Sequence, residues 1–470
     1  MRSLLIHPSC KPRRAVLILV ILGIVLLLFT HPTTRARGYT FLGLSIAPSY
    51  YWLRFQAERL PQHNLALPFP EGKTGRYVKF SVQVNFLGWN NCLGERLMNA
   101  HLAHVSNRAY VFSDYWWAPE HFPFSPAPKS GARTPMGALL AGPVVGGPWH
   151  RDTTFLNDSS HPKSPRAISE RWWNIICPLS SRRLINTEDI KPHIPGGVDH
   201  AAGQLIFDTW RKLLLEAEES CVEIVYTSFD ADTFPQIFDL RLWGGQRVLE
   251  LWEAFSASPV STLLRPSNIV SAAVESNLRK GVFHGRTGGG RPPIGMPMPF
   301  RHMLAIHLRR GDYINHCRFL ASVGSGYYGW SQLKFLPDVA AHRFPGSDDP
   351  QREAKAFAMC LPDIKQVVAR AHQVRQDWDK ALDTVYLLTN ESGEFLDILV
   401  TALLRGGWRT VVTTHDLQLD NEQLGVGMAV DMEIAKRAEV FLGNGWSSFT
   451  SNVIHQRLVA GKDPKSIRML

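Results

Sequence analysis

The sequence predicts an α/β protein with two Rossmann-like domains that face a cleft, preceded by a transmembrane helix and a stem. Three observations predict it. Alternating or wholly apolar strand patterns are followed by helical stripes in both halves of the chain. A Gly/Pro-rich break, TGGGRPPIGMPMP at 287–299, separates the halves. The N-terminus carries basic residues followed by an unbroken apolar run.

The composition is that of a folded protein with room for two domains. The chain has 470 residues, of which 45% are hydrophobic and 20% charged. Its formal net charge is +10 and its pI is about 9.4. The basic residues are scattered and no nucleic-acid-binding signature accompanies them, so we exclude nucleic acid as a partner. A diffuse positive field also suits phosphorylated small molecules.

The N-terminal segment predicts a membrane anchor. We expect a cytosolic tail at 1–14, a transmembrane signal anchor at 15–31 and a stem at 32–75. The apolar run spans 15–29, whereas about 20 residues usually cross a bilayer, and a cleaved signal peptide is the alternative. His31 and Pro32 stand where a small-residue cleavage site would be needed. We therefore expect a single-pass protein whose bulk lies in the lumen of the ER or Golgi.

The cysteines fit an oxidising lumen. Apart from Cys10 in the tail, five cysteines remain, so two pairs at most can form. We expect Cys177 with Cys221 and Cys317 with Cys360, leaving Cys92 free, although spacing alone leaves the pairing open. Sequons at Asn157 and Asn390 are candidates for glycosylation; Asn390 directly follows an apolar strand, so occlusion is equally open there.

The first domain is expected at 76–290. YVKFSVQV (77–84) alternates as a strand, 88–91 form a polar loop, 93–106 carry a helical stripe, and AYVF (109–112) is a second strand. Strand, helix and strand in so short a stretch make a βαβ unit, which implies a parallel sheet. Further along, 118–165 reads as an irregular excursion, CVEIVY (221–226) as a strand, and the residues up to Val282 as helical segments.

The second domain is expected at 300–470, where the alternation restarts. Strands are predicted at 303–308, 384–388, 410–413 and 439–442. Helices are predicted at 351–379, broken at Pro362, and at 394–404 and 447–458.

Two arginines follow the first strand of the second domain. In MLAIHLRRGDYINHC (303–317), Arg309 and Arg310 stand where ligands of open α/β sheets bind. A guanidinium fork matches phosphate oxygens and stays charged. The alternatives are a salt bridge with Asp312, a solvated turn or, more remotely, a cell-adhesion RGD.

A second constellation lies in AEVFLGNGWSSFTSNVIHQRL (438–458). A strand enters two glycines, and hydroxyls follow at the start of a helix: Ser447, Ser448, Thr450 and Ser451. Glycines allow the backbone to approach an anion, and the free N–H groups of a helix start point at it. An ordinary N-cap explains one serine but not four hydroxyls.

Two further patterns concern the first domain. GWNNCLGERL (88–97) brings the amides of Asn90 and Asn91 to a strand–helix turn, where they suit either turn geometry or sugar hydroxyls, with Glu95 one turn beyond. Asp230 and Asp232 follow the strand 221–226 and suggest either a divalent cation held against a diphosphate or an acidic turn.

Together these stretches resemble the GDP-fucose protein O-fucosyltransferase family, and more closely its fungal membrane-anchored relatives. GWNNCLGERLMNAHLAHVSNRAYVF, AGPVVGGPW, HLRRGDYINHC, VYLLTN and DMEIAKRAEVFLGNGWSSFTSN carry the resemblance. It implies a GT-B-like fold, in which the second domain holds the sugar nucleotide, and an inverting transferase that needs no metal and no cofactor besides its donor GDP-fucose.

The resemblance also implies roles for single residues. His307 and Arg309 fall on the family's HxR, with Arg309 at the diphosphate and Arg310 assisting or supporting the strand end. Ser447, Ser448 and Thr450 would line the phosphates, Asp431 the guanine, and Gly88, Asn90 and Asn91 the fucose. Phe86 and Leu87 precede Gly88 where some relatives have a glutamate as acceptor base, so Glu95 is a weak candidate for that base.

The sequence thus predicts transfer of fucose from GDP-fucose to a hydroxyl of a protein or glycan, by Arg309, Asn90 and Glu95. Two other readings remain at this stage. One is a metal-dependent sugar-nucleotide transferase that uses Asp230 and Asp232. The other is a nucleotide-sugar- or glycan-binding protein without turnover.

Overall fold

The computed structural model describes residues 47–125, 127–128, 131–149, 164–284, 299–341, 350–378 and 381–470. The predicted tail, the predicted anchor, the stem up to residue 46, Asn157 and most of the 287–299 break lie outside the described residues. From residue 47 onward, no helix in the described parts is long and apolar enough to cross a bilayer.

The first domain contains a five-stranded parallel sheet in the order β6-β2-β1-β8-β7. Its strands are β1 (Tyr77–Phe80), β2 (Ala109–Phe112), β6 (Ile168–Ser169), β7 (Arg182–Asn186) and β8 (Cys221–Val225). The three predicted strands are confirmed. The strand that begins at Tyr77 is shorter than predicted, because the chain leaves the sheet after Phe80 and adopts a positive φ of 58° at Phe86.

Helices surround this sheet and connect its strands. The longest is α4 (Trp89–Val105), whose first turn contains Asn90 and Asn91 and so begins four residues before the predicted start. The other helices of this part are α3 (Tyr51–Glu58), α5 (Met136–Leu139), α6 (Glu170–Ile176), α7 (Thr187–Ile190), α8 (Gly197–His200), α9 (Gly203–Glu216), α10 (Leu240–Gly244), α11 (Trp252–Ala257) and α12 (Pro259–Thr262). Two small antiparallel pairs complete this part: β3 (Tyr115–Trp116) with β4 (Arg133–Thr134), and β5 (Leu140–Ala141) with β9 (Arg265–Pro266).

The second domain contains another five-stranded parallel sheet, in the order β12-β11-β10-β13-β14. Its strands are β10 (Met303–Leu308), β11 (Thr384–Thr389), β12 (Thr410–Thr413), β13 (Val440–Gly443) and β14 (Ile467–Met469). Every residue of β10 and β11 is buried, which is why both read as apolar runs. All four predicted strands are confirmed, and β14 completes the sheet.

The helices of the second domain are α14 (Tyr313–Ser322), α15 (Pro337–Ala341), α16 (Arg352–Cys360), α17 (Ile364–Asp377), α18 (Glu394–Arg405), α19 (Asn421–Leu424), α20 (Gly427–Arg437) and α21 (Ser448–Val459). The predicted break at Pro362 separates α16 from α17. Helix α13 (Asn268–Arg279) precedes the Gly/Pro-rich break but packs against α20.

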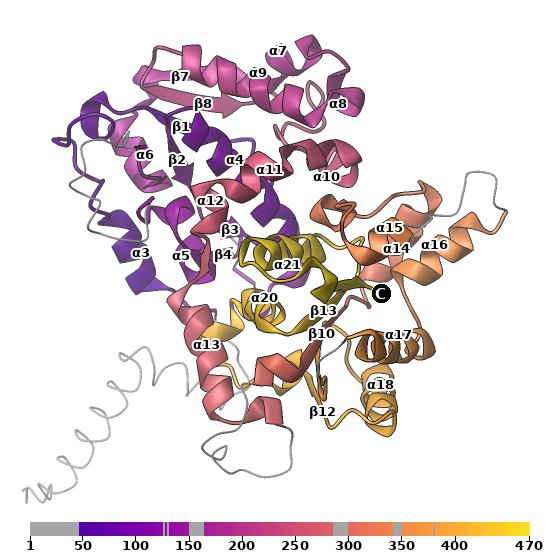
Figure 1. Cartoon of the computed structure of the whole chain (residues 1–470). Coiled ribbons are helices and arrows are strands. Elements are labelled where there is room, and N and C mark those ends of the chain that lie inside the picture. The colour runs from indigo at the N-terminus through magenta and orange to yellow at the C-terminus, as the bar shows by residue number, and fades with distance from the viewer. Residues whose placement is uncertain are drawn as a thin grey trace, which may run out of the picture.

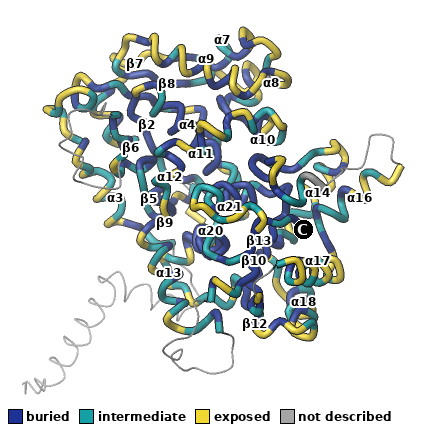
Figure 2. Tube along the Cα trace, viewed as in Figure 1, coloured by how far each residue is buried: buried dark blue, intermediate teal, exposed yellow. Residues whose placement is uncertain are grey.

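The two sheets lie in two lobes, with α21 between them (Figure 1). Helix α4, which follows the carboxyl end of β1, packs against α21, which follows the carboxyl end of β13. The buried stretches of Figure 2 run through both sheets and through this contact. The edges at which parallel strands end are therefore turned toward one another across the α4–α21 contact.

Each domain has one disulfide. Cys177 pairs with Cys221 beside β8, and Cys317 of α14 pairs with Cys360 of α16. Cys92 is free and buried. The expected pairing and the expected free cysteine are confirmed.

Candidate functional site

The second sheet reverses its strand order between β10 and β13. In chain order its strands lie 3-2-1-4-5, so the connections from β10 and from β13 run to opposite sides. Ligands of doubly wound sheets bind outside the carboxyl ends of the strands at such a switch point. The register pairs Ile306 with Leu442, so the segments after Leu308 and Gly443 leave the sheet side by side. Both predicted phosphate-binding constellations are therefore at the same place.

His307 of β10 contacts α21 and so connects the strand before Arg309 with the helix that begins at Ser448. Its Nδ1 lies 3.0 Å from Thr450 Oγ1, and its ring packs against Phe449 at a centroid distance of 4.5 Å. Burial, and secondarily the charge of Arg309, lowers the pKa of His307 to about 3, so the ring is neutral. Thr450 is also fully buried. These two residues join β10 to α21 beneath the surface of the site.

The turn before α21 is built for close packing. A Cβ at Gly443 would lie 2.4 Å from Thr450 Cγ2, and a Cβ at Gly445 would lie 2.4 Å from the Tyr327 ring. Ser447 is the N-cap, and its Oγ accepts from the Phe449 N–H at 3.3 Å. Ser448 is the first residue of the helix. The helix start thus offers N–H groups and hydroxyls at the switch point.

Arg309 follows the last residue of β10, with its side chain 28% exposed. Its Nη2 lies 2.5 Å from Asp312 Oδ2. Among the described residues Asp312 is its one hydrogen-bond partner. A guanidinium has five N–H donors, so donors remain for phosphate oxygens. The ion pair with Asp312 that the sequence allowed as an alternative is present and leaves phosphate binding possible.

Arg310 points elsewhere. Its guanidinium donates to the Pro362 carbonyl at 2.8 Å and to Glu391 Oε2 at 3.3 Å, and it lies 3.9 Å from the centre of the Phe395 ring. These contacts support the end of the strand, which is the second of the two roles expected for it. Direct contact of Arg310 with a donor stays a prediction.

Asp431 lies on α20 and is buried. Its carboxylate accepts from Tyr386 Oη at 2.5 Å and from Thr414 Oγ1 at 3.0 Å. Burial raises the pKa of Asp431 to about 6, although the two hydrogen bonds oppose that shift. An ionised carboxylate has about four acceptor positions, so two remain for the N–H groups of a base. Guanine recognition by Asp431 stays a prediction.

The predicted fucose residues lie at the start of α4. Gly88 is the N-cap, and Asn90 and Asn91 are in the first turn. Asn90 is tied to the second domain, because Asn452 of α21 donates to the Asn90 carbonyl at 2.8 Å and to its Oδ1 at 3.1 Å. The structure therefore places the Asn90 turn directly against the helix that carries Ser447 and Ser448.

Glu95 lies deeper in the first domain, with an exposed fraction of 2%. Its Oε2 accepts from the Val84 N–H at 2.7 Å. Burial raises the pKa of Glu95 to about 7. That value suits a general base, but the contact with Val84 also fixes the segment that leads to Gly88. Its role as acceptor base stays a prediction.

Asp232 already has a cationic partner. Its Oδ2 lies 3.0 Å from Lys191 Nζ, and its Oδ1 accepts from the Phe234 N–H at 3.1 Å. Asp230 is exposed. Because an ammonium group neutralises one carboxylate of the pair, the acidic-turn interpretation fits the contacts better than a cation site does.

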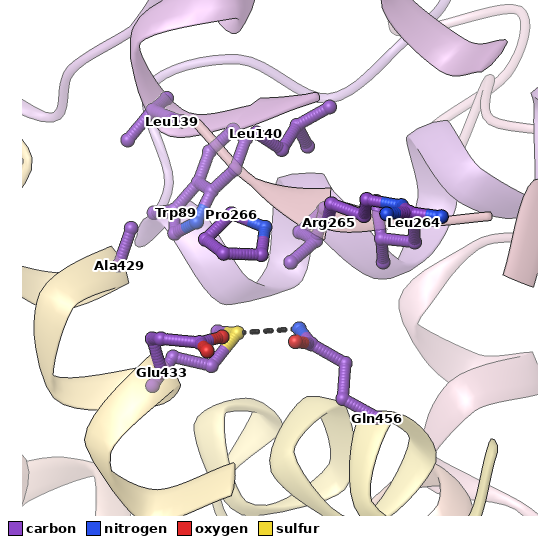
Figure 3. A pocket seen from close by; sticks show the side chains of 11 residues that line it. Trp89, Leu139, Leu140, Leu264, Arg265, Pro266, Ala429, Glu433 and Gln456 are labelled. Carbon is purple, nitrogen blue, oxygen red and sulfur yellow. Dashed lines mark hydrogen bonds between the residues drawn. The ribbon is translucent and has the colours of Figure 1, made fainter. Parts of the chain in front are cut away.

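A separate pocket opens between the domains below the α4–α21 contact (Figure 3). Its cavity of about 20 Å³ has room for roughly one water molecule. Trp89 of α4 faces Glu433 of α20 and Gln456 of α21 across it, Leu93 also lines it, and Gln456 donates to Met432. None of the predicted site residues lines this pocket, which is too small for a sugar nucleotide.

Two residues that form hydrogen bonds with predicted site residues could not be recognised from the sequence. Asn390 bonds to the turn that carries Arg309 and Arg310, and Asn452 bonds to Asn90. Both residues lie in stretches that carry the family resemblance, VYLLTN and SSFTSN. Their hydrogen-bond partners could not be predicted, because these partners are distant in the sequence.

Residues 268–460 match the model of the family described as GDP-fucose protein O-fucosyltransferase. No curated protein matches the chain in sequence. Among solved structures, POFUT1 in complex with GDP is 14% identical and covers 84% of this chain and 98% of its own, with a TM-score of 0.48. The fucosyltransferase NodZ from Bradyrhizobium is 12% identical and covers 82% of this chain and 93% of its own, with a TM-score of 0.33. Through the match at 268–460, this part of the chain is similar to the GDP-fucose protein O-fucosyltransferase family.

Proposed function

We propose that this protein transfers fucose from GDP-fucose to a hydroxyl acceptor with inversion and without a metal ion. One observation carries the proposal. Arg309, which follows β10, and the turn that leads from β13 into α21 both leave the sheet at the switch point of its 3-2-1-4-5 strand order. That is where a doubly wound sheet holds a nucleotide diphosphate.

The chemistry follows from charge. As the bond between fucose and the diphosphate breaks, the sugar becomes oxocarbenium-like and the departing GDP gains negative charge. Arg309 and the N–H groups around Ser447 and Ser448 are fixed donors for that charge. Removing one such donor typically costs about a hundredfold or more in rate.

Fixed donors of this kind can take over the role that a divalent cation plays in other transferases. A guanidinium stays protonated at every physiological pH, so its contribution does not depend on metal supply. The Lys191–Asp232 ion pair supports the same choice, because it neutralises a carboxylate that a metal-dependent mechanism would need.

The acceptor is proposed to approach from the first domain. The Asn90 turn borders α21, so a sugar on the diphosphate would lie between the two domains. Protein serine or threonine and glycan hydroxyls are both compatible with this arrangement. Glu95 is the proposed acceptor base only if the segment around Val84 moves to uncover it.

We further propose that the catalytic part lies in the lumen of the ER or Golgi, anchored by residues 15–31. The two disulfides support an oxidising compartment. The basic residues before the apolar run support a cytosolic N-terminus.

The proposal is tested by measuring GDP release from GDP-fucose by the purified full chain with a panel of peptide and glycan acceptors. We expect acceptor-dependent release that persists in EDTA, and a product whose anomeric configuration is opposite to that of the donor. Arg309→Ala should lower kcat/KM at least about a hundredfold. Arg318→Ala is the matched control, because this α14 arginine donates only to Asn315 of its own helix among the described residues.

Equal turnover by Arg309→Ala and wild type would refute the assignment of Arg309. Loss of activity in EDTA would favour the metal-dependent alternative. Binding of GDP without release across the whole panel would favour a nucleotide-binding protein without turnover.

A further inference from the structure

Asn390 follows the last residue of β11, directly beside the turn that follows β10. The register pairs Leu308 with Thr389, so Arg309 and Asn390 are the next residues beyond the two strand ends. Nothing in the chemistry derived above uses Asn390. Its side chain nevertheless makes more contacts with the arginine turn than any predicted site residue does.

The side-chain amide of Asn390 forms hydrogen bonds with the turn at residues 310–312. Its Oδ1 accepts from the Arg310 N–H at 3.1 Å, and its Nδ2 donates to the Arg310 carbonyl at 2.9 Å. The same Nδ2 donates to Asp312 Oδ1 at 2.8 Å. Both amide hydrogens and the amide oxygen are therefore engaged by residues 310–312.

Asp312 connects Asn390 to Arg309, because its carboxylate accepts hydrogen bonds from both side chains. Asp312 accepts from Asn390 on Oδ1 and from Arg309 on Oδ2, at 2.8 and 2.5 Å. Gly311, which precedes Asp312 in this turn, has a φ of +62°, a left-handed conformation that favours glycine. His121 Nε2 lies 4.0 Å from the same carboxylate, and His316 of α14 also interacts electrostatically with it. Asn390 thus fixes the carboxylate that aims the guanidinium.

We propose that Asn390 is a positioning residue of the donor site, which sets the direction of Arg309 through Asp312. The inference rests on the proposed function, because it assigns Asn390 a role in binding the diphosphate. It adds Asn390, which follows β11, to a phosphate-binding part of the site otherwise built from the segments that follow β10 and β13.

The same contacts make glycosylation and donor binding incompatible at this residue. Asn390-Glu391-Ser392 is a sequon, and attachment of a glycan replaces one Nδ2 hydrogen. Both hydrogens are donated within the turn, so a glycan removes either the bond to Arg310 or the bond to Asp312. The active protein is therefore expected to carry no glycan on Asn390.

Two substitutions separate the sequon from the hydrogen bonds. Asn390→Ala removes both, whereas Ser392→Ala removes only the sequon, because Ser392 is exposed and the contacts of Asn390 stay intact. In the full-length protein we expect Ser392→Ala to differ from wild type in mass only by the one oxygen atom of the substitution, and to match it in GDP affinity and in KM for GDP-fucose. Asn390→Ala should weaken GDP binding about tenfold, which corresponds to one charge-assisted hydrogen-bond arrangement.

A double-mutant cycle of Asn390 and Arg309 distinguishes a residue that positions Arg309 from one that only stabilises the fold. If Asn390 acts through Arg309, Asn390→Ala should have no further effect on the GDP dissociation constant in the Arg309→Ala background. Asn390→Asp is the second variant should Asn390→Ala not fold, since it keeps the acceptor but places a carboxylate against Asp312; it should bind GDP more weakly still.

Three results would overturn the inference: unchanged GDP affinity in Asn390→Ala, an undiminished effect in the Arg309→Ala background, or a glycan on Asn390 of active protein. Failure of the proposed function would look different. In that case wild type and Ser392→Ala themselves would bind neither GDP nor GDP-fucose.

Discussion

Two buried titratable residues of the proposed donor site have pKa values shifted in opposite directions. Burial raises the pKa of Asp431 to about 6 and lowers the pKa of His307 to about 3. In both cases burial disfavours the charged form. At neutral pH His307 is therefore a neutral link to Thr450, whereas Asp431 is ionised only above its raised pKa. Of the two, only Asp431 can change its charge in the physiological range.

We predict that GDP affinity falls as the pH drops through about 6. The N–H groups of guanine need an ionised carboxylate, and Asp431 becomes protonated below its folded-state pKa of about 6. Folding stability depends on pH in the opposite direction. Because the pKa of Asp431 is higher in the folded state than in the unfolded state, its ionisation lowers the free energy of unfolding as the pH rises from about 3.9 to about 6. The measurement is the GDP dissociation constant by calorimetry between pH 5 and 8.

Asp431→Asn is the control for this pH profile. The terminal phosphate of GDP also titrates near pH 6, so part of any pH dependence belongs to the ligand. The variant should bind GDP more weakly at pH 7.5 and keep only the ligand's share of the pH dependence. An identical pH profile in the two proteins would remove Asp431 from guanine recognition.

Among the elements, the contact between α4 and α21 is one of those that join the two domains. Asn452 donates twice to Asn90, and both residues lie near the starts of their helices. We predict that Asn452→Ala lowers kcat/KM for the acceptor while GDP affinity changes less than twofold, because the Asn90 turn loses its position and the phosphate site does not. The readouts are acceptor kinetics and GDP calorimetry; equal losses in both would show that Asn452 serves the whole site.

The two disulfides close loops of nearly equal length. They span 44 and 43 residues, so each restricts the unfolded chain about equally, by roughly 4 kcal/mol. Only Cys317–Cys360 touches the site, because the Cys360 carbonyl accepts from Asn444 Nδ2 at 2.7 Å in the turn before α21.

We predict that removal of either disulfide lowers the melting temperature by a similar amount, but that only Cys317→Ala/Cys360→Ala weakens GDP binding. Cys177→Ala/Cys221→Ala is the control, since its cysteines lie beside β8 in the first domain. Thermal denaturation and calorimetry on both double variants test this. Comparable loss of GDP affinity in both would mean that general destabilisation, not the Asn444 contact, governs the site.

At the scale of the whole molecule, the sequence predicted the second domain better than the first. Strands β10 to β13 are fully or almost fully buried, so their apolar runs identify them without ambiguity. Strand β7 has the sequence RRLIN and two exposed residues, and β6 has only two residues, so neither left a recognisable pattern. The 3-2-1-4-5 order itself depends on which strands pair, which no local pattern contains.

The same limit applies to the site. The positions of Arg309 after a strand and of Ser447 and Ser448 at a helix start could be predicted, because each follows from a local motif. The roles of Asn390 and Asn452 could not, because each depends on a partner 78 to 362 residues away. For Asp230 and Asp232 the local pattern left a cation site and an acidic turn both open, and the ion pair of Asp232 with Lys191, 41 residues away, favours the acidic turn.

The central claim is that the switch point of the second sheet holds the diphosphate of the donor. Titration calorimetry of GDP into wild type and Arg309→Ala tests it most directly, with Arg318→Ala as the folded control. We predict binding by wild type and the control, and at least tenfold weaker binding by Arg309→Ala with an unchanged melting temperature. Equal GDP affinity in all three proteins would contradict the claim.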